Sequence, residues 1–201
     1  MSFHSSSHEA FINSAYLSEL WAVKDLLKFK QNHPEVWSPA REDQLQDEVV
    51  HARSLLNLLK DLQSPIVSDL SFSMQERLYK KYFDLNLCER PEDHCLIHQV
   101  TERRAFWIYK TYLRNHPNSP YAATFERILR DEANHFEVDD IANKSSPFFK
   151  EGIKGTDRIL FRGLLPQKYG SKIFESTAFW SWYYEGARAE LKNDENLNGI
   201  F

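Results

Sequence analysis

Two copies of one acidic motif mark the part of the chain that could do chemistry. The segments Asp47-Glu48-Val49-Val50-His51 and Asp131-Glu132-Ala133-Asn134-His135 share the pattern Asp-Glu-x-x-His. On a helix, residues three positions apart are separated by about 4.5 Å and about 60°, so the Glu and the His of each copy face the same way. A carboxylate and an imidazole side by side are suitable ligands for a transition metal. The repeat therefore predicts metal binding.

The composition makes a chance repeat improbable. A chain of 201 residues with 17 Glu, 12 Asp and 8 His would contain this pattern about 0.04 times by coincidence, and here it occurs twice. Zinc peptidases carry His-Glu-x-x-His, whereas the residue before each Glu here is Asp. The motif therefore disfavours a metallopeptidase.

The segments around these motifs are expected to be helical. Few glycines and long segments with apolar residues at helical spacing predict an all-α protein. We expect four long helices and a fifth near the C-terminus, covering about residues 6–29, 38–62, 91–113, 119–143 and 172–192. The connection of residues 63–90 is too long for a simple hairpin and is expected to contain a short helix.

Local sequence signals set the ends of these helices. Ser38-Pro39 and Ser119-Pro120 each place an N-cap serine before a proline at the first helical position. Pro91 is also expected to open a helix. The segments Asn32-His33-Pro34 and Asn115-His116-Pro117 are expected to end the helices that precede them.

One glutamate interrupts the apolar stripe of each long helix: Glu19, Glu48, Glu102 and Glu132. Four carboxylates in one core cannot all remain ionised unless a multivalent cation neutralises them. The number of residues between each glutamate and the neighbouring turn also places the four at matching heights along the helices. Glu19 lies about 15 Å before the end of the first helix, and Glu48 about 13.5 Å after the start of the second. Glu102 lies about 18 Å before the end of the third helix, and Glu132 about 18 Å after the start of the fourth.

Two other interpretations of the carboxylates remain open. Glu9 could replace Glu19 as the ligand from the first helix, although it lies at the expected cap and far from the level of the others. Alternatively, the carboxylates could form a buried salt-bridge network with basic residues such as Arg103 or Arg130.

The residues quoted above resemble the ligands of the ferritin-like di-iron or di-manganese carboxylate proteins, which use Glu from two helices and Glu-x-x-His from two others. The resemblance covers residues 8–143. It implies a four-helix bundle with a long crossover between the second and third helices. It also implies two iron ions, or manganese in one or both positions. The implied ligands are Glu19, Glu48 and His51 for one metal and Glu102, Glu132 and His135 for the other, with Glu48 and Glu132 bridging.

The resemblance also gives the aspartates of the motif a role. In this family, the aspartate before the Glu often bonds the metal-bound histidine of the opposite motif. It therefore implies that Asp131 bonds His51 and that Asp47 bonds His135, so that each aspartate orients a ligand.

The ligand intervals of 29, 3, 51, 30 and 3 residues are similar to those of tRNA hydroxylases and aldehyde-deformylating oxygenases. We therefore expect a non-haem di-iron oxidoreductase, an O2-dependent hydroxylase or oxygenase that acts on an organic substrate. Such an enzyme needs an external electron donor such as a ferredoxin. One alternative is a ferroxidase or a rubrerythrin-like or bacterioferritin-like iron-handling protein. The other is a metal-free helical interaction module.

Four further side chains lie within about two turns of the expected ligands. His94 and His98 precede Glu102, whereas Tyr16 and Tyr109 lie near Glu19 and beyond Glu102. For all four we expect packing or surface positions rather than chemistry.

Length, charge and cysteine content indicate the domain organisation, cellular location and possible partners of the protein. We expect a single domain over residues 1–201, with a bundle core of 8–143 and a helical extension of 144–201. The two cysteines outside any C-x-x-C pair and the lack of an export signal favour a cytoplasmic protein. No run of about 18 apolar residues predicts a membrane span, and the net charge of −4 gives no general attraction to nucleic acid. We expect a monomer or homodimer. Residues 144–172 carry seven Lys or Arg against two acidic residues, which could contact tRNA or form a solvated face.

Overall fold

The computed structural model describes residues 7–66, 90–135 and 138. These residues form α1 (Ser7–Asn32), the short 3-10 helix η1 (Pro34–Val36), α2 (Pro39–Asp61), α4 (Pro91–Asn115) and α5 (Ala122–His135). They include no strand, so the predicted all-α class is confirmed for this part of the chain. Among the described helices, none has the length and apolar character needed to cross a membrane.

The predicted helix starts are largely those observed. The Ser38 hydroxyl accepts a hydrogen bond from the Arg41 amide at 3.3 Å and caps α2, with Pro39 in the first turn. α4 begins at Pro91, as expected. By contrast, α5 begins three residues after Ser119, because the Ser119 carbonyl accepts the Ala122 amide in a turn that precedes the helix.

The other differences lie between α1 and α2 and beyond the described residues. α1 continues to Asn32 and is followed by η1, which the sequence did not predict. Proline lacks an amide hydrogen, which is why Pro34 ends α1 and can open a new helical turn. The short helix expected within 63–90 and the predicted helix end near residue 143 fall outside the described residues. The same holds for the extension 144–201, including the basic segment 144–172 and the expected helix 172–192.

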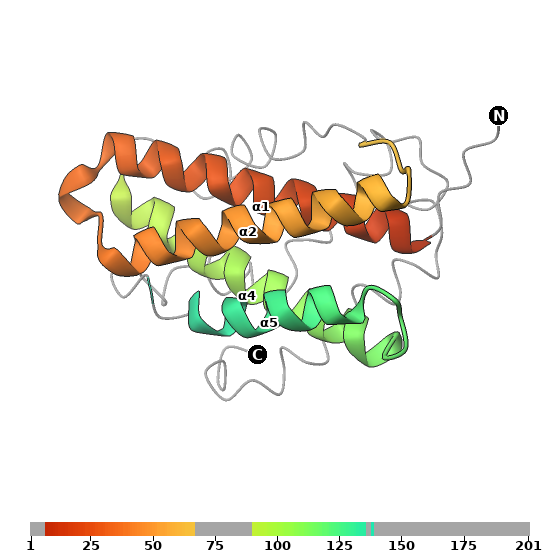
Figure 1. Cartoon of the computed structure of the whole chain (residues 1–201). Helices are drawn as coiled ribbons and strands as arrows, with labels where there is room; N and C mark the ends of the chain where they lie inside the picture. The colour runs from red at the N-terminus through yellow and green to blue at the C-terminus, as the bar shows by residue number, and fades with distance from the viewer. Residues whose placement is uncertain (1–6, 67–89, 136–137, 139–201) are drawn as a thin grey trace, which may run out of the picture.

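The helices pack as two hairpins. α1 packs against α2, α4 against α5, and α2 also contacts α5 (Figure 1). Near the starts of α2 and α4, the Arg41 guanidinium donates a hydrogen bond to Cys95 Sγ at 2.9 Å. Since these two helices begin at the same end, they run in the same direction. The end of α2 and the beginning of α4 consequently lie at opposite ends of the molecule, as a long crossover requires.

The interior has an apolar end and a second end, called the polar end below, where buried polar side chains lie among apolar ones. The apolar cluster lies at the beginning of α1 and α5 and the end of α2 and α4, and comprises Phe11, Ile12, Ala15, Leu55, Leu59, Tyr109, Tyr112, Phe125 and Ile128. Burying each large side chain contributes about 1.5–3 kcal/mol. Toward the opposite end, buried apolar side chains such as Leu26, Phe29 and Ile97 are interspersed with buried polar ones: Asp25, Arg41, Gln44, His94, His98 and Gln99. Glu19, Glu48, Glu102 and Glu132 lie between the two ends.

Candidate metal centre

The structure brings all six expected ligands together at one level of the helices. α1 contributes Glu19, α2 contributes Glu48 and His51, α4 contributes Glu102, and α5 contributes Glu132 and His135. None of these residues is more than 4% exposed. Glu9, the alternative to Glu19, lies in the first turn of α1 and is not among them. The spacing of these residues along the four helices therefore places them in one buried cluster.

The first half of the cluster surrounds the Nδ1 atom of His51. This nitrogen lies 3.4 Å from Glu19 Oε2, 3.7 Å from Glu48 Oε2 and 3.5 Å from Glu132 Oε1. Metal–ligand bonds of about 2.0–2.2 Å place two ligand atoms of one ion about 2.9–3.5 Å apart. The four residues therefore converge on a space about the size of one metal ion.

The second half repeats this arrangement around His135. Its Nδ1 atom lies 3.3 Å from Glu102 Oε2, 3.3 Å from Glu48 Oε1 and 3.8 Å from Glu132 Oε2. Glu48 and Glu132 thus belong to both halves, and each directs one carboxylate oxygen to each histidine. This is the geometry expected of two carboxylates that bridge a pair of metal ions.

The aspartates of the two motifs contact the far side of the histidine rings, crosswise between α2 and α5. His51 Nε2 lies 3.0 Å from Asp131 Oδ2, and His135 Nε2 lies 3.4 Å from Asp47 Oδ2. When Nε2 carries the proton and donates it to the aspartate, the lone pair on Nδ1 points at the glutamates. The pairing implied by the family resemblance is therefore the one that the helices make.

Two further contacts, not foreseen from the sequence, hold the glutamates that do not bridge. Gln44 Nε2 donates a hydrogen bond to Glu102 Oε1 at 3.1 Å, and the Tyr109 hydroxyl donates one to Glu19 Oε1. Gln44 lies one helical turn before Glu48 on the same face of α2. A polar residue among the buried positions of this face was the only signal in the sequence for its contact with Glu102. Tyr109 was expected only to pack, and it also forms part of the apolar cluster.

Burial and mutual contacts shift the protonation of the metal-free cluster. Burial raises the pKa of Glu19 to about 8, with the neighbouring Glu48 adding to the effect. Burial also opposes the charge of Glu48, but contacts with His135 and His51 lower the pKa of Glu48 to about 2. Desolvation would lower the pKa of His135, whereas Glu102 and Glu48 raise it to about 12. Without a cation, the cluster therefore retains protons at neutral pH.

The cluster fits a pair of divalent cations better than a salt-bridge network. Its described ion pairs are with histidines, and Arg130, one of the expected partners, is exposed. Among the described residues, no hydrogen-bond partner exists for Glu48 Oε1, His51 Nδ1 or Glu132 Oε2, and each buried atom left so costs about 1–3 kcal/mol. Two divalent cations would supply those partners and neutralise four carboxylates.

Asp131→Asn is expected to weaken metal binding by about 10-fold to 100-fold while leaving the site intact. The asparagine amide can present a hydrogen-bond donor to His51 Nε2, which favours the tautomer with its proton on Nδ1, facing the glutamates. Competition with a chelator measures the affinity. Asp61→Asn, at the exposed end of α2, is the matched control. Equal affinities of wild type and Asp131→Asn would contradict this role.

The metal-free protein is expected to lose stability as the pH rises from about 5 to 8. Over this range the folded protein keeps a proton on Glu19, whose pKa is about 8, while the unfolded chain releases it near the ordinary value of 4.5. The raised pKa of His135 acts in the same direction above about pH 6.5. Thermal unfolding in a chelator, followed by circular dichroism, measures the trend; a midpoint that rises with pH would contradict it.

The chain's own geometry favours metal binding: two carboxylates are shared between two histidines, two further carboxylates are held in place, and all six side chains are buried. Carboxylate and imidazole ligands of this kind suit iron or manganese. Comparison of the chain with protein-family models, with curated proteins and with solved structures found no match.

Proposed function

We propose that the protein is a ferritin-like non-haem di-iron oxidoreductase that uses O2 to hydroxylate or oxygenate an organic substrate. The observation that carries this proposal is the sharing of Glu48 and Glu132 between His51 and His135, with one carboxylate oxygen directed to each ring. Glu19 and Glu102 complete the two halves. When two iron ions are bound there, they supply the redox chemistry with O2.

The surroundings of the cluster support an organic substrate. The apolar cluster reaches the centre through Tyr109, which contacts Glu19. Ala15 and Ala52 are buried within four residues of Glu19 and Glu48, and their side chains leave more space than larger residues would. Apolar walls also exclude water from the reacting groups. An apolar substrate or a hydrocarbon part of a larger one would suit this side of the centre.

A ferroxidase or iron-handling protein is the second candidate. The polar end of the interior supports it, because the buried pair His94 and His98 lies on the opposite side of the centre from the apolar cluster. The imidazole nitrogens of these two histidines could bind a metal ion on its way to the dinuclear site. In that case Fe(II) would be the substrate rather than a resident cofactor.

Anaerobic Fe(II) loading followed by exposure to O2 tests both candidates. We expect two iron ions per chain after desalting. In the proposed oxygenase, O2 uptake with excess Fe(II) stops once the bound iron is oxidised and resumes only with an electron donor such as a reduced ferredoxin. Continued oxidation of excess Fe(II) would favour the ferroxidase. Iron near zero would favour the metal-free interaction module and contradict both.

The size of the protein in solution gives an independent test. A monomer or homodimer agrees with an oxygenase, whereas a shell of many subunits favours iron storage. Contact with tRNA through residues 144–172 remains a separate proposal, since this basic segment lies outside the described residues.

A further inference from the structure

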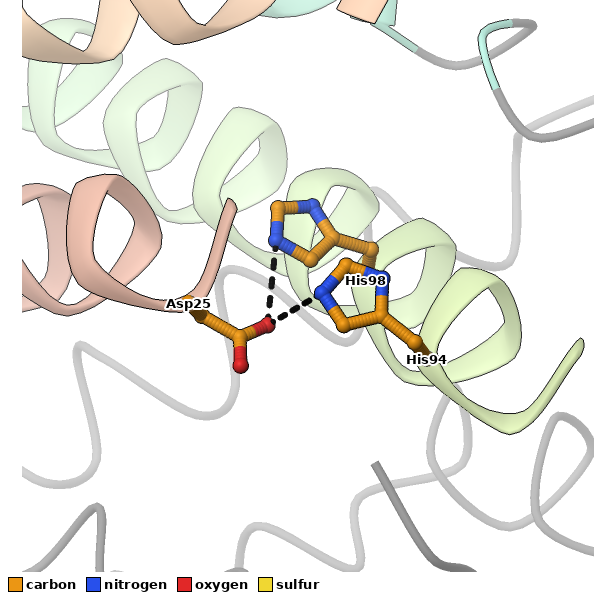
Figure 2. A group of neighbouring side chains, drawn as sticks. All are labelled: Asp25, His94 and His98. Atoms are coloured by element: carbon orange, nitrogen blue, oxygen red, sulfur yellow. Dashed lines mark ion pairs between the residues drawn. The ribbon is translucent and has the colours of Figure 1, made fainter. Parts of the chain in front are cut away.

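A second cluster of metal-ligating side chains lies in the polar end of the interior, apart from the six residues above. It consists of Asp25 from α1 and the pair His94 and His98 from α4 (Figure 2). Asp25 Oδ2 lies 2.7 Å from His94 Nε2 and 3.4 Å from His98 Nε2. The two histidines are four residues apart, so one helical turn places both rings on one face. Figure 2 shows both rings turned toward the same carboxylate oxygen.

These atoms are buried and lack hydrogen-bond partners. The side chain of Asp25 is 4% exposed, and those of His94 and His98 are each 1% exposed. Despite the short separations, neither Asp25 Oδ2 nor any ring nitrogen of the two histidines has a hydrogen-bond partner with suitable geometry among the described residues. Five buried polar atoms without a hydrogen bond of suitable geometry are costly, although four of them lie within ion-pair distance of a neighbour. A cation bound between them would satisfy three of the five at once.

Aromatic packing holds the imidazoles in this orientation. Trp21 stacks on His98, His98 on His94, and His94 on Phe29, with ring centroids 6.2, 4.8 and 4.0 Å apart. The interplanar angles of 16°, 21° and 19° make this one continuous stack of four rings from α1 and α4. A stack of this kind fixes the direction of the ring nitrogens before any ligand arrives.

We propose that Asp25 Oδ2, His94 Nε2 and His98 Nε2 bind a third, single divalent transition-metal ion. Their separations of 2.7 and 3.4 Å lie close to the range of about 2.9–3.5 Å that two ligands of one ion adopt. Two histidines and one carboxylate leave other coordination positions of the ion open. This ligand set suits Fe(II), Co(II) or Zn(II).

The third site is connected to the dinuclear centre through one side chain. His98 Nδ1 lies 3.2 Å from Glu102 Oε1, and Glu102 belongs to the second half of the centre. With a metal on Nε2, the proton of His98 resides on Nδ1 and faces this carboxylate, as the second nitrogen of a metal-bound histidine commonly does. The two sites therefore share one contact but no ligand.

Charge predicts the order in which the sites fill. The dinuclear centre offers four carboxylates to two ions, whereas the third site offers only Asp25. Arg41, buried at the same end, places a positive charge near His94. This charge opposes a cation by Coulomb repulsion. The third ion is therefore expected to bind more weakly and after the first two.

Anaerobic equilibrium dialysis of the full-length chain against increasing Co(II) tests the site, because dialysis also detects weakly bound ions. His94→Gln and Asp25→Asn remove a ligand while preserving approximate size, and His98 is left intact because it contacts Glu102. His116→Gln, at the end of α4 and outside both clusters, is the control. We expect each ligand variant to bind one Co(II) fewer per chain than wild type and the control.

The same difference is expected when Glu132→Ala removes the dinuclear centre, so that Glu132→Ala/His94→Gln binds one ion fewer than Glu132→Ala. Comparing the variants in the Glu132→Ala protein therefore tests the third site separately from the dinuclear centre. If Glu132→Ala binds as many ions as wild type, the dinuclear centre is wrong, whatever His94→Gln shows. Equal counts for wild type, His94→Gln and Asp25→Asn would overturn the third site. If His94→Gln lost its helical circular dichroism, the isosteric Asp25→Asn would decide.

Discussion

Glu132→Ala is expected to remove both metal ions of the dinuclear centre, although it removes one ligand side chain of six. Glu132 directs Oε1 toward His51 and Oε2 toward His135, so its loss takes a ligand from each half of the centre. It also leaves three carboxylates where four are needed to balance two divalent cations. Metal content after anaerobic Fe(II) loading and desalting should fall from near two per chain to near zero, and O2 uptake with it.

The fold should survive this change. Alanine is the best helix former, and the apolar cluster that holds α5 through Phe125 and Ile128 is untouched. Circular dichroism should therefore show nearly unchanged helical content. Glu126→Ala, at an exposed position of the same helix, is the matched control and should keep both ions. A Glu132→Ala protein that still held two ions would show that the bridging assignment is wrong.

The second large effect is on stability, which metal binding is expected to raise by several kcal/mol. An ion that binds only the folded state stabilises it by about 4 kcal/mol at a thousandfold excess over its dissociation constant. Two such ions would contribute about 8 kcal/mol, comparable with the whole stability of a typical domain. Because 1 kcal/mol shifts the midpoint of a protein this size by about 2–4 °C, Fe(II) should raise it by about 15–30 °C.

Thermal unfolding under anaerobic conditions, with Fe(II) or with a chelator, measures this shift at a fixed pH. The physical reason for the large effect is that the metal-free cluster keeps buried carboxylates in mutual contact, and one oxygen each of Glu48 and Glu132 lacks a hydrogen bond. Glu132→Ala/His94→Gln, which lacks a ligand of each proposed site, serves as the control, since its midpoint should respond little to Fe(II). Identical midpoints of the wild-type protein in Fe(II) and in chelator would contradict a metal centre in this cluster.

Features that depend on spacing within one helix could be predicted from the sequence. The period of the helix fixes which residues share a face, so Glu48 and His51 had to point the same way, as did Glu132 and His135. N-cap and proline signals located the starts of α2 and α4, because capping chemistry is local. The rise per residue even predicted that the glutamates of four helices would lie level.

Contacts between helices were decided by the tertiary structure. The rotation of each helix about its axis and its distance from its neighbours depend on how all the side chains pack, which no single segment encodes. This packing determines which oxygen of Glu48 faces which histidine, and it places the Tyr109 hydroxyl on Glu19. The crosswise contacts of Asp47 and Asp131 were expected from the family resemblance, not from their spacing.

The cluster of Asp25, His94 and His98 shows the same division. The spacing of the two histidines was visible in the sequence, and packing or surface positions were expected for both. Asp25, on a different helix and 69 residues before His94, carried no signal of its own. Only the packing of α1 against α4 brings its carboxylate to within 2.7 Å of His94. The sequence by itself thus determined the helices, their faces and the level of the motif ligands, whereas the tertiary structure decided which residues from different helices meet.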